Sequence, residues 1–127
     1  MKTTLLSLIA CMFTFCAAFG QDNNCLKKMR TGNFKYDVRG DDVIIVRTKK
    51  TQTEYINSGK SKLVLKIKWL SDSVYVLKQK KAVNVPGCLH KGDEIVVKIT
   101  RCYGNKYDAE YTTKKCGDGA STFIRIE

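Results

Sequence analysis

The stretch KLVLKIKWL, residues 62–70, alternates apolar and basic side chains almost without interruption. Its apolar residues recur at every second position: Leu63, Leu65, Ile67 and Trp69. Its basic residues stand between them: Lys62, Lys66 and Lys68. Because successive side chains of a β-strand point to opposite faces of a sheet, this period of two is typical of a strand with one buried face. The stretch therefore predicts an amphipathic strand.

Similar alternation continues from residue 32 to the end of the chain, and no segment has the period of a helix. Clusters of Gly, Asn, Asp and Ser separate the alternating runs and indicate turns. The pattern predicts eight strands, near residues 32–38, 43–49, 52–57, 62–70, 74–81, 94–103, 107–114 and 121–127. The single proline, Pro86, falls in the longest connection, where it interrupts no strand pairing.

Short connections between most of the strands predict an all-β, single-domain antiparallel meander. The first and last of eight such strands run antiparallel to each other, so the sheet can close into an up-and-down, lipocalin-like barrel. Closure also removes the exposed strand edges. A two-sheet β-sandwich is the alternative architecture.

Two strand registers follow from the alternation. Trp69 and Tyr75 both face inward if Leu70 opposes Val74 across a turn at residues 71–73. If Ile99 and Tyr111 both face inward, residue 103 pairs with residue 107. That pairing leaves Gly104, Asn105 and Lys106 as a three-residue loop, which suits residues that accept positive φ.

The first twenty residues are typical of a signal peptide. Lys2 precedes an apolar run over residues 5–15, and Ala18 and Gly20 occupy the −3 and −1 positions of a cleavage site before Gln21. We expect a signal peptide at residues 1–20 and a secreted or periplasmic domain at residues 21–127. In the alternative, cleavage before Cys11 and lipidation of that cysteine give a lipoprotein. Such a cleavage would leave the signal peptide with a very short apolar run. No later segment approaches the length of a membrane-spanning helix.

Four cysteines follow the predicted cleavage site, and an even number in a small exported domain indicates two disulfides. The connections of a meander alternate between the two ends of the barrel. Cys25 and Cys102 therefore fall at one end, and Cys88 and Cys116 at the other, which predicts the pairs Cys25–Cys102 and Cys88–Cys116. No two of these cysteines have the close spacing of a zinc site.

Arg47, Gln52 and Glu54 are the candidate interior polar residues. If the apolar residues before Arg47 in its strand face inward, Arg47 does too, and Gln52 and Glu54 share one face of the next strand. A buried Arg–Glu pair should then be hydrogen-bonded. The functional interpretation is a polar anchor for a ligand, with Trp69 and Tyr75 beside it in the barrel. The alternatives are a structural buried pair and a pair that faces solvent.

The chain carries 23 Lys and Arg against 12 Asp and Glu, a formal net charge of +11. On the predicted register, Lys66 opposes Lys78 and Val64 opposes Lys80 on the outer face. Five lysines then form a stripe, which we call the lysine stripe: Lys62, Lys66, Lys68, Lys78 and Lys80. Opposed like charges cost stability, which suits a surface that binds an anionic polymer or an envelope glycolipid. Alternatively, the lysines only keep the sheet soluble.

The stripe lacks the exposed aromatic side chains that specific nucleic-acid binding usually adds. The sequence predicts no catalytic, cofactor or metal site. The one histidine, His90, falls in a loop beside a cysteine. We therefore expect a non-catalytic exported barrel that binds a small or anionic envelope ligand. The alternative is a structural or interaction protein of the cell envelope with a filled barrel and no small-molecule site.

Several short motifs follow one another along the chain: Cys25, Thr31-Gly32-x-Phe34-x-Tyr36, Arg47-Thr48, Gln52-x-Glu54-Tyr55, Trp69-Leu70-Ser71-Asp72 and Tyr75-x-Leu77. This ordered set resembles a family of small exported proteins of Bacteroidetes-type bacteria, which has no established biochemical role. Some relatives carry a label referring to DNA topoisomerase IV, which this short chain, without an ATPase phosphate loop, does not support. Cys88, Cys102 and Cys116 are additional to the family pattern.

Overall fold

The computed structural model describes residues 23–127. The predicted signal peptide, its cleavage site and the alternative lipidation at Cys11 lie outside the described residues. The described chain consists of one short helix followed by eight strands: α1 (Asn23–Lys28), β1 (Gly32–Val38), β2 (Asp41–Arg47), β3 (Thr51–Ile56), β4 (Ser61–Trp69), β5 (Val74–Val83), β6 (Glu94–Tyr103), β7 (Lys106–Thr113) and β8 (Asp118–Arg125).

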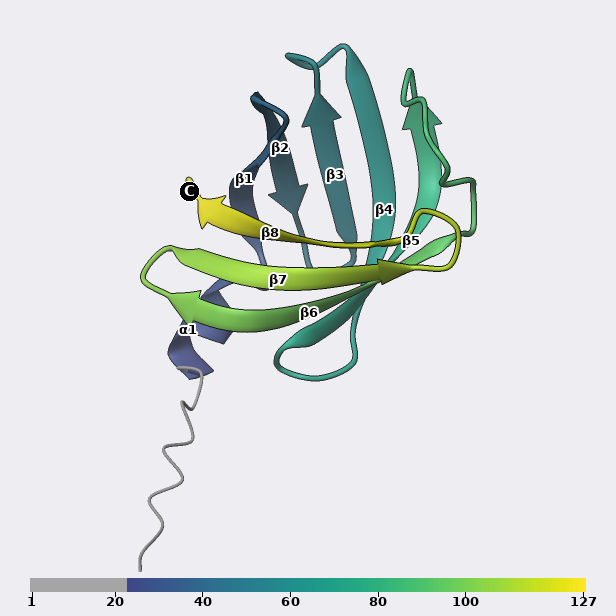
Figure 1. Ribbon diagram of the computed structural model, residues 1–127. Coiled ribbons are helices and arrows are strands. Elements are labelled where there is room, and N and C mark those ends of the chain that lie inside the picture. Colours follow the sequence, from purple (N-terminus) through teal and green to yellow (C-terminus); the bar gives the residue numbers. More distant parts are fainter. Residues whose placement is uncertain (1–22) are drawn as a thin grey trace, which may run out of the picture.

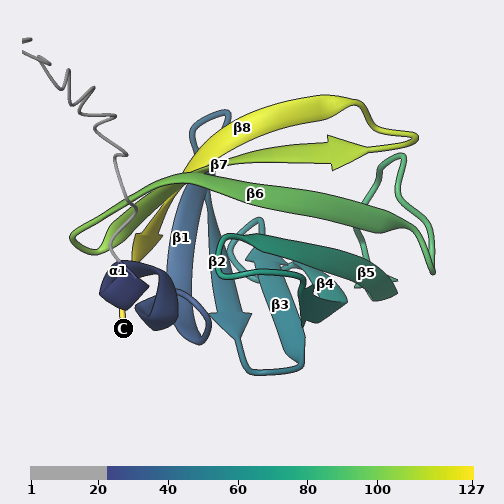
Figure 2. The same cartoon turned by 90° about the horizontal axis from the view of Figure 1, so that it is seen from below.

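The eight strands form a closed antiparallel barrel in sequence order, as the alternation predicts. Each strand pairs with the next one along the chain, and β1 closes the barrel by pairing Phe34 with Arg125 and Lys35 with Ile124 of β8. The molecule is therefore a closed barrel and not a two-sheet sandwich. Strands β6–β8 cross over β2–β5 at a steep angle, so the barrel has two walls that face each other (Figures 1 and 2).

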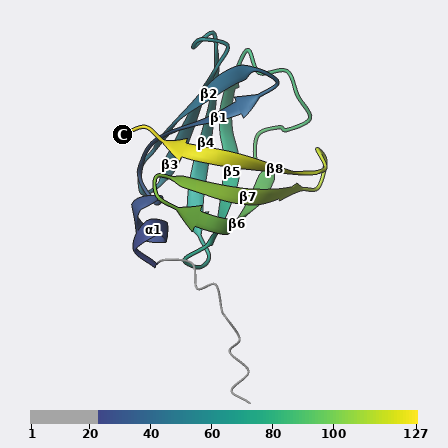
Figure 3. The ribbon, with the colours of Figure 1, turned by 60° about the vertical axis from the view of Figure 1, so that its left-hand side comes forward.

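The two ends of the barrel differ. We call the end beside α1 the closed end, to which the β2–β3, β4–β5 and β6–β7 connections also belong (Figures 1 and 3). Cys25, Leu26 and Met29, in and just after α1, are buried. At the open end lie the β1–β2, β3–β4, β5–β6 and β7–β8 connections. The alternation did not predict α1, because six residues are too few to show a helical period.

Aromatic and aliphatic side chains fill the half of the barrel nearer the closed end. Phe34 and Tyr107 are completely buried, and their ring centroids lie 6.0 Å apart in an edge-to-face arrangement. The ring of Tyr107 also stacks on Phe123 at 4.8 Å. Such aromatic pairs add to the stabilisation that comes from burying their apolar area.

The β1–β2 turn is tighter than the sequence suggests. Val38 pairs with Asp41, so only Arg39 and Gly40 form the loop, and both have positive φ (52° and 89°). A two-residue loop of this kind matches the twist of the flanking strands. Strand β2 therefore covers residues 41–47, and the predicted range of 43–49 is wrong by two residues at each end.

The predicted three-residue loop between β6 and β7 is wrong. A bulge leaves Thr100 without a partner in the β7 register, so Ile99 pairs with Ala109 instead of Tyr111. Both Ile99 and Cys102 are buried despite their spacing of three residues. The extra residue shifts the alternation by one, and the loop shortens to Gly104 and Asn105.

The predicted register between β4 and β5 is confirmed near the closed end, where Trp69 pairs with Tyr75 and Lys66 with Lys78. Beyond this point a bulge changes it. Leu65 pairs with Gln79 and Val64 with Lys81, so the predicted pairing of Val64 with Lys80 is wrong. Lys80 is the extra residue of the bulge, a feature that bends a strand and increases its local twist.

The structure contains the two disulfides that the alternating connections predict. Cys25–Cys102 joins α1 to β6 at the closed end, and Cys88–Cys116 joins the β5–β6 and β7–β8 connections at the open end. The cross-links span 77 and 28 residues of sequence, respectively. Among residues 23–127, no helix is long and apolar enough to cross a membrane.

Removing each disulfide with paired cysteine-to-alanine substitutions should lower the free energy of unfolding by different amounts. The chain-entropy model assigns about 4.5 kcal/mol to the Cys25–Cys102 cross-link and about 3.6 kcal/mol to Cys88–Cys116, because the first closes the longer loop. Urea unfolding of the two double variants measures both losses. A larger loss for the Cys88–Cys116 variant would contradict this ranking.

Candidate functional site

The half of the barrel nearer the open end is hollow. This cavity, which we call the hollow, has a volume of about 420 Å³ and receives side chains from every strand except β2 among the described residues. Its apolar wall comes mainly from Leu63, Leu77, Ile95 and Val97. Larger depressions of about 540 and 500 Å³ lie outside the barrel, at the β1–β2 and β3–β4 turns and beside residues 112–115. The hollow alone among these three has buried polar side chains in its wall.

Four side chains form a hydrogen-bonded series from the barrel core to the hollow, which we call the polar chain: Arg47, Gln52, Glu54 and Tyr36. Arg47 Nε donates to Gln52 Oε1 at 2.9 Å, and Gln52 Nε2 donates to Glu54 Oε2 at 3.1 Å. The hydroxyl of Tyr36 donates to Glu54 Oε1 at 2.5 Å. Arg47 and Glu54 are thus linked through Gln52, and the predicted inward-facing pair is hydrogen-bonded.

Arg47 lies at the boundary between the filled half and the hollow. Its Nη1 donates to the carbonyl oxygen of Met29 at 2.6 Å, and its Nη2 contacts the hydroxyls of Tyr75 (3.2 Å) and Tyr107 (2.8 Å). The guanidinium also lies 4.6 Å from the ring centroid of Phe34. All three nitrogen atoms of the Arg47 guanidinium therefore donate hydrogen bonds within the chain, and Arg47 does not line the hollow.

Glu54 is the buried carboxyl group of the hollow, with only 6% of its surface exposed. Burial raises the pKa of Glu54, and the hydrogen bonds from Tyr36 and Gln52 and the charge of Arg47 oppose this shift only in part. Burial also raises the pKa of Tyr36, and the nearby carboxyl group of Glu54 raises it further. The charged form of Glu54 is thus disfavoured in this chain when nothing else occupies the hollow.

The structure brings together four of the five predicted interior residues, namely Arg47, Gln52, Glu54 and Tyr75. Trp69 does not line the hollow. It lies toward the closed end, where its ring packs on Tyr75 at 4.7 Å and the guanidinium of Arg30 covers it at 4.8 Å.

Sequence reasoning missed two aromatic residues of the hollow, Tyr36 and Phe123, whereas Tyr111, which the alternation expects to face inward, does line it. Tyr36 could have been found, since it has the same parity in β1 as the inward-facing Phe34. The position of Tyr111 depends on a neighbour, because its ring lies where a Cβ atom at Gly119 would collide with it. To predict that contact, one must know that Tyr111 pairs with Gly119 of the neighbouring strand.

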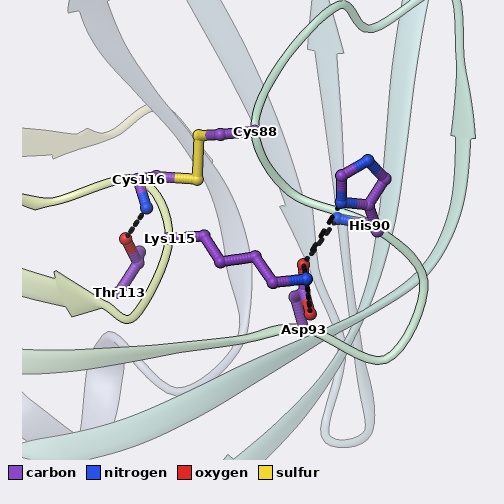
Figure 4. Close-up of polar contacts among 6 residues, drawn as sticks. All are labelled: Cys88, His90, Asp93, Thr113, Lys115 and Cys116. Carbon is purple, nitrogen blue, oxygen red and sulfur yellow. Dashed lines mark hydrogen bonds and ion pairs between the residues drawn. A yellow bond between two sulfur atoms is a disulfide. The ribbon is translucent and has the colours of Figure 1, made fainter.

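The β5–β6 connection, residues 84–93, forms a loop at the open end that we call the mouth loop. Leu89 of this loop lines the hollow. The Cys88–Cys116 disulfide and an ion pair between Lys115 and Asp93 (3.2 Å) hold the loop against the β7–β8 connection (Figure 4). The backbone N–H of His90 donates to Asp93 at 2.8 Å and, with Lys115, lowers the pKa of Asp93.

The five side chains of the lysine stripe are all exposed on β4 and β5. Lys66 directly opposes Lys78, as predicted. Lys78 also opposes Glu94 of β6, which partly offsets its charge. Lys80 belongs to the stripe by exposure, although it stands in the bulge and has no partner in β4.

No protein-family model, no curated protein and no solved structure matches this chain. The resemblance to a family of exported bacterial proteins therefore stays a prediction. Within residues 23–127, no group of three or more His, Cys, Asp or Glu side chains is placed to hold a metal ion. The features that bear on function are consequently the geometry of the hollow and that of the outer surface.

Replacing Glu54 with Gln should change how stability depends on pH. The folded-state pKa of Glu54 is raised above its unfolded value of about 4.3, so the folded wild-type chain binds this proton more tightly than the unfolded chain does. The stability of the wild type relative to Glu54→Gln should be greatest at low pH and should decrease as pH rises through the folded-state pKa. Urea unfolding of both chains from pH 4 to pH 8 measures this trend.

The matched control is Glu110→Gln, which removes an exposed carboxylate on the outer face of β7. The corresponding stability difference should not follow the same trend with pH. A difference between wild type and Glu54→Gln that stays constant, or grows in favour of the wild type with rising pH, would contradict the assignment.

Proposed function

We propose that this protein is a non-catalytic binding protein that takes one small, largely apolar molecule into the hollow. The observation that carries the proposal is the volume of about 420 Å³ at the open end of the barrel. Cavities of about 300–1,000 Å³ are the size that small-molecule ligands occupy. Eight-stranded barrels are either filled by side chains or hold one small ligand, and here the side chains fill only the closed half.

The composition of the wall supports the same proposal. Binding sites for small molecules are mostly apolar and contain a few polar groups that fix the ligand's orientation. The hollow has this character, with aliphatic and aromatic side chains around the carboxyl group of Glu54 and the hydroxyl of Tyr36. The alternative, a structural protein with a filled barrel, does not account for this volume.

The mouth loop supports retention of a ligand. Leu89 extends the apolar wall beyond the strands, while the disulfide and the Asp93–Lys115 ion pair restrict movement of the loop. The loop therefore adds a held apolar contact beside the hollow. This arrangement suits a protein that carries a molecule through an aqueous compartment.

We further propose that the protein is exported to the periplasm or secreted. The signal-peptide pattern of residues 1–20 supports this location. Two disulfides are compatible with an oxidising compartment outside the cytosol.

Binding of the neutral dye N-phenyl-1-naphthylamine, whose fluorescence rises in apolar surroundings, tests the site. We expect saturable binding of one dye per chain. Ile56→Trp, which adds volume at the wall of the hollow, should weaken binding by at least about tenfold. The matched control Val96→Trp places the same ring on the outer face, where Val96 is 40% exposed, and should bind like the wild type. Dye binding that does not saturate, or that both variants weaken equally, would contradict the proposal.

The lysine stripe supports a second function, binding to an anionic polymer or an envelope glycolipid. Lys66 and Lys78 lie directly opposite each other and are exposed, a like-charge pairing that costs stability and that Glu94, opposite Lys78 in β6, offsets only in part. The net charge of +11 attracts such partners over distance. This binding uses the outer face and is independent of the hollow.

Reversing two charges in the stripe should weaken binding to an anionic polymer. We expect Lys66→Glu/Lys78→Glu to elute from immobilised heparin at a lower salt concentration than the wild type, because the variant makes fewer ion contacts with the polymer. Each lost contact lowers the slope of log K against log salt concentration by about one. The control, Lys27→Glu/Lys106→Glu, changes the net charge equally at exposed sites away from the stripe. If both variants elute at the same salt, the stripe is only a solvated surface.

A further inference from the structure

The charged residues that line the hollow are both acidic, and no lysine, arginine or histidine lines it among the described residues. Glu54 is buried, whereas Asp37 is exposed beside the β1–β2 turn. This contrasts with the whole chain, in which basic residues outnumber acidic ones by 23 to 12. The basic side chains that predominate in the chain are therefore not among the described residues that line the hollow.

The carboxyl group of Glu54 can accept further hydrogen bonds. Each of its oxygens accepts one hydrogen bond within the chain, from Tyr36 and from Gln52. A carboxylate offers about four acceptor positions, so each oxygen has room for a second donor. A ligand that donates hydrogen bonds can thus join the polar chain at its exposed side.

An anionic ligand finds no comparable partner. The guanidinium of Arg47 is buried, and its hydrogen bonds go to Gln52, Met29, Tyr75 and Tyr107. It lies behind Gln52 and does not line the cavity. An anion in the hollow would meet the carboxyl group of Glu54 without a compensating positive charge from the described residues that line it.

Four aromatic side chains surround the same space: Tyr36, Tyr75, Tyr111 and Phe123. The rings of Tyr36 and Phe123 are in contact, with their centroids 5.0 Å apart. Aromatic faces attract organic cations, and the attraction is greater where water is excluded. The aliphatic side chains of the wall suit the apolar part of the same molecule.

We propose that the ligand of the hollow is a small organic cation, in which an ammonium or amidinium group on an apolar body lies against Glu54 and the surrounding aromatic rings. This inference rests on the proposed function of the hollow and names the chemical class of its ligand. The cation neutralises a buried carboxylate, which is costly to leave uncompensated in an apolar site. Ionisation of Glu54 and binding of the cation therefore favour each other.

Three probes with the same phenylethyl body and different polar ends test the class of ligand. They are 2-phenylethylammonium, 2-phenylethanol and 3-phenylpropanoate, and isothermal titration at pH 7.5 measures their dissociation constants. We expect the cation to bind at least tenfold more tightly than the alcohol, and the carboxylate to bind most weakly. Glu54→Gln should reduce the preference for the cation over the alcohol to less than about twofold.

The control Glu110→Gln removes an equal charge from the outer face and should keep the preference of the wild type. Equal or tighter binding of the alcohol to the wild type, or failure of the cation to displace N-phenyl-1-naphthylamine at 10 mM, would overturn the inference but leave the binding site intact. Absence of binding by the dye and by all three probes would instead overturn the proposed function. The comparison on the wild type decides the outcome even if Glu54→Gln does not fold.

Discussion

The interior of the barrel depends on the hydrogen bonds that the buried guanidinium of Arg47 donates. Removing a cation from water costs several kcal/mol, so its hydrogen bonds must be well placed. Here they reach the backbone after α1, strand β3 and two tyrosines on strands of different walls, Tyr75 of β5 and Tyr107 of β7. These directional bonds connect the closed end to both walls. Apolar packing alone would fix the relative position of the two walls less specifically.

The surroundings of Arg47 and Glu54 differ, and this difference follows the division of the interior into a filled and a hollow half. Around Arg47, the rings of Phe34, Tyr75 and Tyr107 occupy the interior and contact the guanidinium. Beyond Gln52, the interior polar group is the carboxyl of Glu54, and the surrounding side chains leave the hollow open. The guanidinium and the carboxyl group thus lie on either side of Gln52, and of these two groups only the carboxyl group lines the hollow.

The alternation of residues predicted the strands, the inward position of Arg47 and the ends at which the cysteines meet, because a period of two determines side-chain direction and a meander alternates its connections. It failed where one residue breaks the period. Thr100 and Lys80 each shift the register by one, and neither residue type marks a bulge. The hollow was not predictable either, since alternation shows which side chains face inward but not how far rings such as Tyr111 extend across the barrel.

The basic outer surface and the acidic hollow act over different distances. The exposed lysines are surrounded by water and salt, which screen their fields within about 8 Å at physiological ionic strength. At a separation of 4 Å near a protein surface, opposite unit charges attract by on the order of 4 kcal/mol. A cation beside Glu54 is therefore governed by that carboxyl group and by the surrounding rings. The net charge of the molecule therefore does not prevent a cation from binding inside the barrel.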